Sequence, residues 1–372
     1  YISLAKAKGL SNAYILLRHA LRPSSFTLIT IVGIQLGNLI SGAVIVENNK
    51  VISSGFTQQP GQSHAEIMAL ENLNEKSNNA TLYVTLEPCS HTGKTPPCVD
   101  KIISSGITKV VYGIEDPNPK VSGNGIRKLR EANIIVEKSN NTSLIKTFYE
   151  AYIHYHKQQK PFISAKFAAS LDGKIATSSG ESKWITNELS RNKAHKIRAA
   201  SDVIIVGINT IIKDNPLLTA RKEDGNEYEY QPLKVILDSN CNIPIESNVM
   251  NNPTNTLIAY NQISDDKNKL FEQKGINSIK LPKEDKVDIN ELISFLYSKS
   301  KYQILVEGCS ETLGTFFNLD LIDKVYAFIA PILIGGQNTP SAIGGFGANT
   351  MSDIILSLIH ISEPTRPERI WY

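Results

Sequence analysis

Hydrophobic and polar positions alternate in short blocks along most of this chain. Between residues 42 and 137, runs rich in β-branched residues alternate with segments whose apolar residues recur at helical spacing. Such alternation predicts a largely parallel sheet with helices on its faces. The runs predict a hairpin at 43–56 and strands at 81–86, 109–113 and 134–137, and the segments between them predict helices at 64–75, 97–105 and 125–132.

A polar segment separates this first series of elements from a second one. Residues 143–160 predict a linker helix that is basic at its end and is closed by Pro161. The blocks therefore predict two α/β domains, one at 1–142 and one at 161–356. In the second domain, apolar runs predict strands at 162–167, 203–207, 234–238, 256–260, 303–307 and 325–329, and the polar stretch 221–231 predicts a surface loop.

The size of the chain agrees with two hydrophobic cores. It has 372 residues, whereas single cores rarely exceed about 250 to 300 residues. Apolar residues make up 41% and charged residues 20%, as in ordinary soluble proteins. The net charge of +3 is too small to indicate a nucleic-acid partner, but a few Lys and Arg side chains could bind a phosphorylated small molecule.

One uncharged run, 26–46, is long enough to span a bilayer. It holds 21 residues, and two arginines precede it. Polar interruptions, including Gln35 and Asn38, weaken that interpretation, and residues 42–46 are better explained as a buried strand. No small-residue cleavage site follows a short apolar core, so no signal peptide is predicted. We therefore expect a cytoplasmic protein that does not enter a membrane.

The cysteine content favours metal ligation over disulfide bonds. The chain has four cysteines, and a chain of this size does not need disulfides for stability. Cys89 and Cys98 lie nine positions apart in a stretch rich in motifs, which is better explained by metal ligation. This interpretation agrees with a reducing compartment.

His64, Cys89 and Cys98 together supply the donor set of a catalytic zinc site. Such a site has three protein ligands and an open position for water, and zinc lowers the pKa of that water. Glu66, two residues after His64, is suited to move protons rather than bind metal, as a deaminase requires. A His-Ala-Glu triplet alone is common, and cysteines are often simply buried. The full set in this order, with Pro88-Cys89 directly after a strand, favours zinc.

The loop between the two cysteines is longer than in most zinc deaminases, where two residues separate them. Here eight residues do, within the run TLEPCSHTGKTPPC at 85–98. Together with DPNP at 116–119 and GNG at 123–125, this run closely resembles the deaminase half of the bifunctional deaminase–reductase family of riboflavin biosynthesis. The resemblance covers about residues 42–140. It implies a cytidine-deaminase-like three-layer α/β domain.

The same resemblance implies two substrate-binding residues in the long loop. Lys94 would approach the ribose phosphate of the substrate, and His91 would lie near it. The alternative for Lys94 is a solvated loop charge.

The second domain has no Gly-x-Gly-x-x-Gly motif after a strand, so a Rossmann dinucleotide site is not supported. Its runs SAKFAASLDGK at 164–174, GESKWIT at 180–186 and DNPLLT at 214–219 resemble the reductase half of the same family, over about residues 160–340. That half has a dihydrofolate-reductase-like fold. The resemblance places Ser182, Leu218 and Glu307 at the substrate and Ala168, Trp184, Thr210, Asp214 and Ser239 at NADPH.

Two features of this second set have a physical interpretation of their own. The planar guanidinium groups of Arg198 and Arg221 are suited to a substrate phosphate. Cys309 stands where the family usually has Gly, which makes a close approach of the cofactor to the backbone less certain there. The resemblance implies a pyrophosphate-facing turn formed by Cys309, Ser310, Glu311, Thr312, Leu313 and Gly314.

The resemblance implies two consecutive reactions on a phosphorylated pyrimidine. In the first, a zinc site removes an amine from a diaminopyrimidinone ribosyl phosphate and releases ammonia. In the second, NADPH transfers hydride to C1′ of the sugar and converts ribosyl to ribityl, and the protein supplies positioning and electrostatics. Pairing of reductase domains into homo-oligomers is common in the family.

Both ends of the chain depart from the family pattern. Residues 1–10 resemble its opening helix, but residues 11–41 lack the expected Pro-Asn-Pro substrate loop, as an insertion or frame error would explain. Near the other end, residues 359–367 resemble translated sequencing-adapter DNA. We therefore interpret 357–372 as a non-native tail and expect the last strand of the reductase sheet to be missing.

Two other functions agree with parts of the sequence. One is a stand-alone zinc deaminase acting on another nucleobase or nucleoside, which activity on free cytidine would support. The other is a non-catalytic remnant that binds only zinc or nucleotide. Zinc content without turnover would indicate the remnant.

Overall fold

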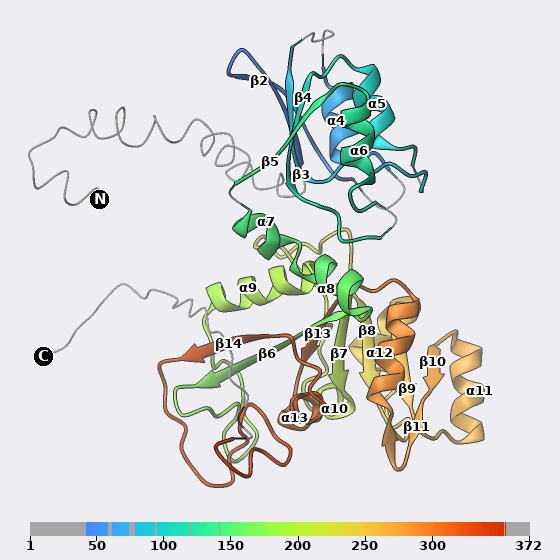
Figure 1. Ribbon diagram of the computed structural model, residues 1–372. Helices are drawn as coiled ribbons and strands as arrows, with labels where there is room; N and C mark the ends of the chain where they lie inside the picture. The colour runs from blue at the N-terminus through green and yellow to red at the C-terminus, as the bar shows by residue number, and fades with distance from the viewer. Residues whose placement is uncertain are drawn as a thin grey trace, which may run out of the picture. The chain divides into compact units, whose positions relative to one another are not determined.

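The computed structural model of the chain consists of two α/β units, divided between Lys157 and Gln158 (Figure 1). This division falls within residues 143–160, the segment that was predicted as a linker. The domain boundaries predicted at 142 and 161 stay predictions. The structure describes residues 42–58, 62–73, 79–93, 95–119, 121–140, 142–352 and 354. Predictions for 1–41, for Lys94 and for 357–372 therefore lie outside the described residues.

The first unit is built on a mixed sheet of order β2-β1-β3-β4-β5. Its strands β3, β4 and β5 are parallel, whereas β1 is antiparallel to both β2 and β3. The prediction of a largely parallel sheet is therefore wrong for half of this unit. The strands are β1 (Gly42–Glu47), β2 (Lys50–Phe56), β3 (Thr81–Leu86), β4 (Lys109–Ile114) and β5 (Ile135–Lys138).

The predicted hairpin is confirmed, and its turn explains the antiparallel pairing. Asn48 and Asn49 have φ angles of 50° and 62°. Two successive left-handed residues make the tight turn whose twist matches that of paired strands, and Asn tolerates this conformation well. The strand predicted at 42–46 is confirmed as β1, which is almost completely buried. None of the helices that the structure describes is long and apolar enough to cross a membrane.

Three helices lie side by side on one face of this sheet (Figure 1). Ile102 and Leu129 from two of the helices pack with Ile45, Leu82 and Val110 of the strands, and all five side chains are fully buried. The three predicted helices are thus confirmed within a few residues at each end. They are α4 (Ala65–Glu71), α5 (Cys98–Ser104) and α6 (Asn124–Glu131).

The predicted linker helix is two helices, α7 (Ser143–Phe148) and α8 (Glu150–Gln158). The break falls at Tyr149, whose φ and ψ of −88° and 13° leave the helical region. Its hydroxyl lies 3.1 Å from Oγ1 of Thr85, and Ile145 packs against the backbone of Gly113. These contacts with β3 and β4 are tertiary, so the helical pattern of 143–160 did not reveal the break.

The second unit has an entirely parallel sheet of order β10-β9-β8-β7-β13-β6-β14. The six predicted strands are confirmed, whereas β10 was not predicted. A separate two-stranded ribbon, β11–β12, joins β10 to the next helix. The strands are β6 (Phe162–Ser170), β7 (Val203–Gly207), β8 (Leu233–Leu237), β9 (Thr256–Tyr260), β10 (Asn277–Lys280), β11 (Pro282–Lys283), β12 (Lys286–Val287), β13 (Gln303–Glu307) and β14 (Lys324–Ala330).

Helices cover both faces of this sheet. On β7, Val203 and Ile205 belong to one buried cluster, with α12 and α13, while Ile204 and Val206 belong to the other, with α9, α10 and α11. Because both faces are covered, all five residues of β7 are buried, as parallel central strands usually are. The helices are α9 (Glu188–Ala199), α10 (Ile208–Asp214), α11 (Asp265–Lys274), α12 (Ile289–Ser298) and α13 (Ser310–Asn318), with short 3₁₀ turns at Asn248–Asn251 and Pro253–Asn255.

Candidate metal centre and reductase site

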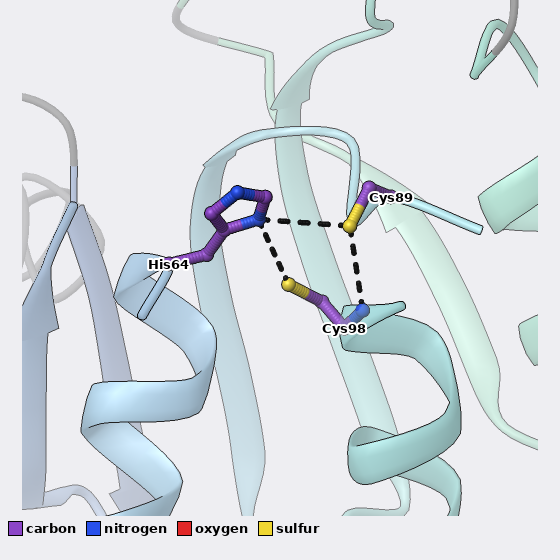
Figure 2. A group of neighbouring side chains, drawn as sticks. All are labelled: His64, Cys89 and Cys98. Atoms are coloured by element: carbon purple, nitrogen blue, oxygen red, sulfur yellow. Dashed lines mark hydrogen bonds between the residues drawn. The ribbon is translucent and has the colours of Figure 1, made fainter. Parts of the chain in front are cut away.

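Three predicted ligands converge at the start of two helices in the first unit. Figure 2 shows the imidazole of His64 facing the thiols of Cys89 and Cys98. His64 is the N-terminal cap of α4, Cys98 is the first residue of α5, and Cys89 lies in the loop after β3. Nδ1 of His64 lies 3.2 Å from Sγ of Cys98 and 3.6 Å from Sγ of Cys89.

These distances fit a tetrahedral zinc site. Zinc–nitrogen bonds of about 2.0–2.1 Å and zinc–sulfur bonds of about 2.3 Å hold neighbouring ligand atoms roughly 3.5 Å apart. The three ligand atoms lie within 4.8 Å of one another, and they form the only such cluster among the described residues. One imidazole and two thiolates would leave one tetrahedral position open, as catalytic zinc sites do.

The two thiols differ because they share a hydrogen bond. The bond from Cys98 lowers the pKa of Cys89 to about 4, with further support from His64. The same bond and burial raise the pKa of Cys98. The backbone N–H of Cys98 also donates to Sγ of Cys89 at 3.3 Å, as expected for an anion at a helix N-terminus. These hydrogen bonds favour the thiolate form of Cys89, which is the form in which cysteine binds a metal.

Glu66 is a buried carboxyl group in the first turn of α4. Only 8% of the residue is exposed, and burial raises the pKa of its carboxyl group to about 7. A carboxyl group with such a pKa takes up and releases a proton near neutral pH, as general acid–base catalysis requires. Its position next to the cluster agrees with the predicted role in proton transfer.

Glu87 organises the loops around the cluster, although the sequence analysis did not assign it a role. Its two carboxylate oxygens accept hydrogen bonds from four backbone N–H groups, and the residue is only 2% exposed. The donors are Asp116, Gly123, Gly125 and Ile126, at 3.0–3.3 Å. The sequence offered one signal for this role, which is an acidic residue between a strand and a Pro-Cys pair. The hydrogen-bond partners of Glu87 could not be predicted from it, because they lie at least 29 residues away.

Close packing of α6 fixes the backbone next to Cys89. A Cβ atom on Gly125 would lie 2.0 Å from the carbonyl oxygen of Pro88, so only glycine fits there. Lys128, one turn further along α6, donates to the carbonyl of Ser90 at 3.0 Å. The residues on both sides of Cys89 are thus held by the same helix.

Substitution of Gly125 by Ala is expected to destabilise the first unit by about 1–3 kcal/mol and to weaken zinc binding. Alanine is normally about 1 kcal/mol better than glycine in a helix, but the clash with the Pro88 carbonyl group requires a backbone shift that costs more. Urea unfolding and zinc content measure the two effects. Gly93→Ala is the control, because its Cβ would lie 3.6 Å from its nearest neighbour. A Gly125→Ala variant as stable as the wild type would contradict the packing argument.

His91 lies in the loop between Cys89 and Cys98, and Lys94, which was expected near it at the substrate phosphate, is outside the described residues. Nδ1 of His91 is buried and has no hydrogen-bond partner among the described residues. A buried polar nitrogen without a partner is unfavourable, and a bound ligand could satisfy it. Substrate binding by His91 remains a proposal.

In the second unit, the predicted cofactor residues cluster at the carboxyl ends of adjacent strands. The connections after β7 and β13 run in opposite directions along the sheet, to β8 and to β14. Such a switch point forms a crevice in which parallel sheets bind ligands. Thr210 follows β7, Ser239 follows β8, and Cys309 follows β13 as the N-terminal cap of α13.

Three glycines allow close packing at this point, two against threonine side chains and one against backbone. Cβ atoms on Gly207 and Gly308 would lie 2.4 Å and 2.6 Å from the hydroxyls of Thr312 and Thr210. A Cβ on Gly314 would lie 2.4 Å from backbone atoms of Gly344. The turn 309–314 is therefore packed closely against the end of β7, and the N-terminus of the nine-residue helix α13 presents backbone N–H groups of the kind that bind a pyrophosphate.

Four other residues predicted at the cofactor differ from these in their location and burial. Ala168 is a partly buried residue of β6, whereas Trp184 is 72% exposed and stacks on Arg191, at 4.6 Å from the guanidinium carbon. Asp214 is exposed at the end of α10. The side chain of Leu313 is fully buried in the core, so only its backbone could face a ligand.

Arg198 and Glu307, both predicted at the substrate, form a buried ion pair with each other. Nε and Nη2 of Arg198 donate to the two carboxylate oxygens of Glu307, each at 2.8 Å. Nη1 donates to the carbonyl of Thr219. The guanidinium group of Arg198 is therefore not free to bind a phosphate in the way expected from the sequence. Arg221 is exposed, which leaves it as the better candidate.

Two residues close to the ion pair differ from what the sequence suggested. Leu218 has a φ of 53° and its side chain is buried in the core, while its contact with the substrate stays a prediction. His195 donates from Nδ1 to the carbonyl of Thr219 at 3.2 Å, and burial, with the charges of Arg198 and Arg221, lowers its pKa. His195 was not predicted as a site residue. Its spacing of three from Arg198, which puts both on one helix face, was the available signal.

Lys166 is a second residue that the sequence analysis missed. It pairs with Glu307 across β6 and β13, and burial lowers its pKa. Ser182 is partly buried in the loop before α9. The structure thus gathers Lys166, His195, Arg198 and Glu307 into one polar group, at the carboxyl ends of strands on the side where the cofactor residues lie.

Comparison with known proteins covers both units. Residues 33–114 match the cytidine and deoxycytidylate deaminase zinc-binding region, and residues 161–363 match the RibD C-terminal domain. The riboflavin biosynthesis protein RibD of Aquifex aeolicus is 39% identical over 79% of this chain and 81% of its own length. The protein of the same name from Bacillus amyloliquefaciens is 38% identical over 85% of each chain.

The chain belongs to the RibD family.

Solved RibD structures share the fold of both units. Acinetobacter baumannii RibD superposes with a TM-score of 0.78 at 29% identity, over 91% of this chain and 94% of that one. A Thermotoga maritima structure has a TM-score of 0.71 at 34% identity, over 83% and 84% of the two chains. It is described as a diaminohydroxyphosphoribosylaminopyrimidine deaminase/5-amino-6-(5-phosphoribosylamino)uracil reductase. The predicted fold class, a cytidine-deaminase-like domain followed by a RibD reductase domain, is confirmed, and a stand-alone deaminase is not favoured.

Proposed function

We propose that this RibD-family chain performs two consecutive steps of riboflavin biosynthesis. The first is hydrolytic deamination of 2,5-diamino-6-ribosylamino-4(3H)-pyrimidinone 5′-phosphate, and the second is reduction of the ribosyl group to ribityl by NADPH. The observation that carries the first step is the convergence of His64, Cys89 and Cys98 beside the buried Glu66. The family membership of both units supports the pairing of the two steps.

In the deamination, water adds to the carbon that bears the amine, and ammonia leaves. Zinc held by His64, Cys89 and Cys98 would supply a water with a lowered pKa. Glu66 accepts a proton from that water and then delivers it to the departing amine. Burial raises the pKa of the Glu66 carboxyl group, which suits a group that must both accept a proton and return it.

In the reduction, the second unit binds and orients its ligands. NADPH would supply the hydride that is transferred to C1′ of the sugar. The turn 309–314 at the start of α13 would hold the pyrophosphate, with Thr210 and Ser239 from neighbouring strand ends. Ser182 and the exposed guanidinium group of Arg221 would contact the substrate and its phosphate, and Glu307 would remain paired with Arg198 beside it.

The partners and location follow from the same chemistry. A phosphorylated pyrimidine is the substrate, and the net charge of +3 favours a free small molecule over a nucleic acid. The free thiols of all four cysteines agree with a cytoplasmic location. Pairing of reductase units into a homo-oligomer completes the proposal.

Removal of zinc is expected to abolish ammonia release from the diaminopyrimidinone ribosyl phosphate and to leave NADPH oxidation on the deaminated substrate within about twofold of wild type. The reason is that the three predicted ligands all lie in the first unit, and the reductase residues lie in the second. The measurement compares both rates, with about one zinc per chain before chelation. Re-addition of zinc should restore ammonia release. Undiminished ammonia release from zinc-free protein would contradict the proposed site.

A further inference from the structure

A buried carboxylate that no step above uses lies next to the metal centre. Asp116 follows β4 by two residues, and Cys89 follows β3 by three, and these two strands are parallel with Leu86 paired to Ile114. Their following loops therefore lie side by side. The backbone N–H of Asp116 donates to Glu87 at 3.3 Å, two residues before Cys89, and only 5% of Asp116 is exposed.

The orientation of this carboxylate is set by two donors. The backbone N–H of Asn118 donates to Oδ1 at 2.8 Å, and the hydroxyl of Tyr152 donates to the same oxygen at 3.0 Å. Burial raises the pKa of Asp116, and these two hydrogen bonds oppose that rise. Neither bond uses Oδ2. Two donors on one oxygen fix the plane of the carboxylate and leave Oδ2 as the oxygen that can accept from a ligand.

Tyr152 comes from a part of the chain that was predicted only as a linker. It lies on α8, outside the strands and helices that carry the metal ligands. Its ring is held by an edge contact with His156 at 4.5 Å and by Tyr149 at 6.2 Å between ring centroids. A ring held on two sides has little rotamer freedom, so its hydroxyl presents a fixed donor to Asp116.

We propose that Tyr152 is a positioning residue of the deaminase, whose hydroxyl holds the Asp116 carboxylate at the wall of the metal centre to accept a hydrogen bond from the pyrimidine nucleotide. The inference rests on the proposed deaminase function. Amino and hydroxyl groups of such a substrate are donors that suit a carboxylate oxygen. Tyr152 acts on binding rather than on proton transfer, because its hydroxyl reaches Asp116 and not Glu66.

The test measures steady-state ammonia release by full-length Tyr152→Phe protein. The Michaelis constant is expected to rise about tenfold, the size of effect typical for a lost hydrogen bond to a charged group, with kcat within about twofold. Tyr149→Phe is the matched control, because it keeps the ring beside Tyr152 and removes a hydroxyl that shares a hydrogen bond with Thr85 rather than with Asp116. It should change neither constant. Zinc content and thermal unfolding verify that both variants fold.

A double-mutant cycle with Asp116→Asn distinguishes positioning from a general structural effect. If Tyr152 acts through Asp116, adding Tyr152→Phe to Asp116→Asn raises the Michaelis constant no further. Additive effects, or a lower kcat with loss of zinc in Tyr152→Phe alone, would overturn the inference. If the wild type is active and Tyr152→Phe has the same Michaelis constant and kcat, the inference is overturned but the proposed function is not. A zinc-loaded wild type that releases no ammonia overturns the proposed function and the inference with it.

Discussion

Replacement of Glu66 by Gln is expected to reduce ammonia release at least about a hundredfold, and up to about ten-thousandfold, while zinc content stays at the wild-type value. This range is what general acid–base catalysis typically contributes. Glutamine has nearly the same shape and fills the same buried site, but its amide cannot take a proton from water and return it to a leaving amine. Ammonia release by zinc-assayed protein measures the loss.

The control for this substitution lies on the same helix. Glu71→Gln makes the same chemical change at the exposed end of α4 and should leave ammonia release unchanged. NADPH oxidation on the deaminated substrate should be at the wild-type rate in both variants. Ammonia release by Glu66→Gln within tenfold of wild type, at full zinc content, would show that another group moves the proton.

Replacement of Glu307 by Ala is expected to destabilise the second unit by about 3–5 kcal/mol. The side chains of Arg198 and Glu307 are only 17% and 7% exposed, and removal of one partner leaves a buried charge without a counter-charge. Urea unfolding of the full-length variant measures the change, and unfolding of the first unit should be unaffected. The double variant Arg198→Met with Glu307→Leu should recover most of the loss, because replacing both charges removes the desolvation cost.

An exposed ion pair, in which Lys196 lies on the same helix as Arg198, provides the comparison. Lys196 and Glu223 approach to 2.7 Å, but both are more than half exposed, and Glu223→Ala should cost less than about 1 kcal/mol. Equal losses in Glu307→Ala and Glu223→Ala would show that burial does not set the contribution of the inner pair.

The buried pair also predicts a pH dependence of stability. Burial alone would raise the pKa of Glu307, but the charge and hydrogen bonds of Arg198 lower it to about 2. A carboxyl group whose folded pKa is below its unfolded value stabilises the fold above the unfolded pKa, near 4.5, and loses that contribution as the pH falls towards 2. The stability difference between wild type and Glu307→Gln should therefore shrink through that window.

Two buried glutamates, one in each unit, have opposite pKa shifts because their neighbours differ. Burial is the largest influence on Glu66 and outweighs the opposing charge of His64, so the pKa of Glu66 rises to about 7. Glu307 is equally buried but has a bidentate guanidinium partner, so its pKa falls to about 2. The first arrangement suits proton transfer and the second suits a permanent charge that orders the polar group around it.

Local patterns in the sequence determined the secondary structure and the metal donor set. The strands and most helices were predicted because side chains alternate along strands and recur every three to four residues along helices, within short windows. His64, Cys89 and Cys98 were recognisable because each stands at the boundary of a predicted element, and chain geometry carries such boundaries to one end of a sheet. The hairpin turn at Asn48 and Asn49 was equally local.

The tertiary structure alone decided the features that depend on residues far apart in the chain. Arg198 reaches Glu307 across 109 positions, and the donors to Glu87 lie 29 to 39 positions away. The break at Tyr149 depends on Thr85, and the burial of Leu218 and Leu313 depends on helices that pack over the sheet. Such contacts leave no periodic signal, because nothing in the local sequence of one partner depends on its distance from the other. The sequence by itself therefore determined which elements and ligands this RibD-family chain has, and only the packing of the sheets decided which charges are paired and which remain free for substrate.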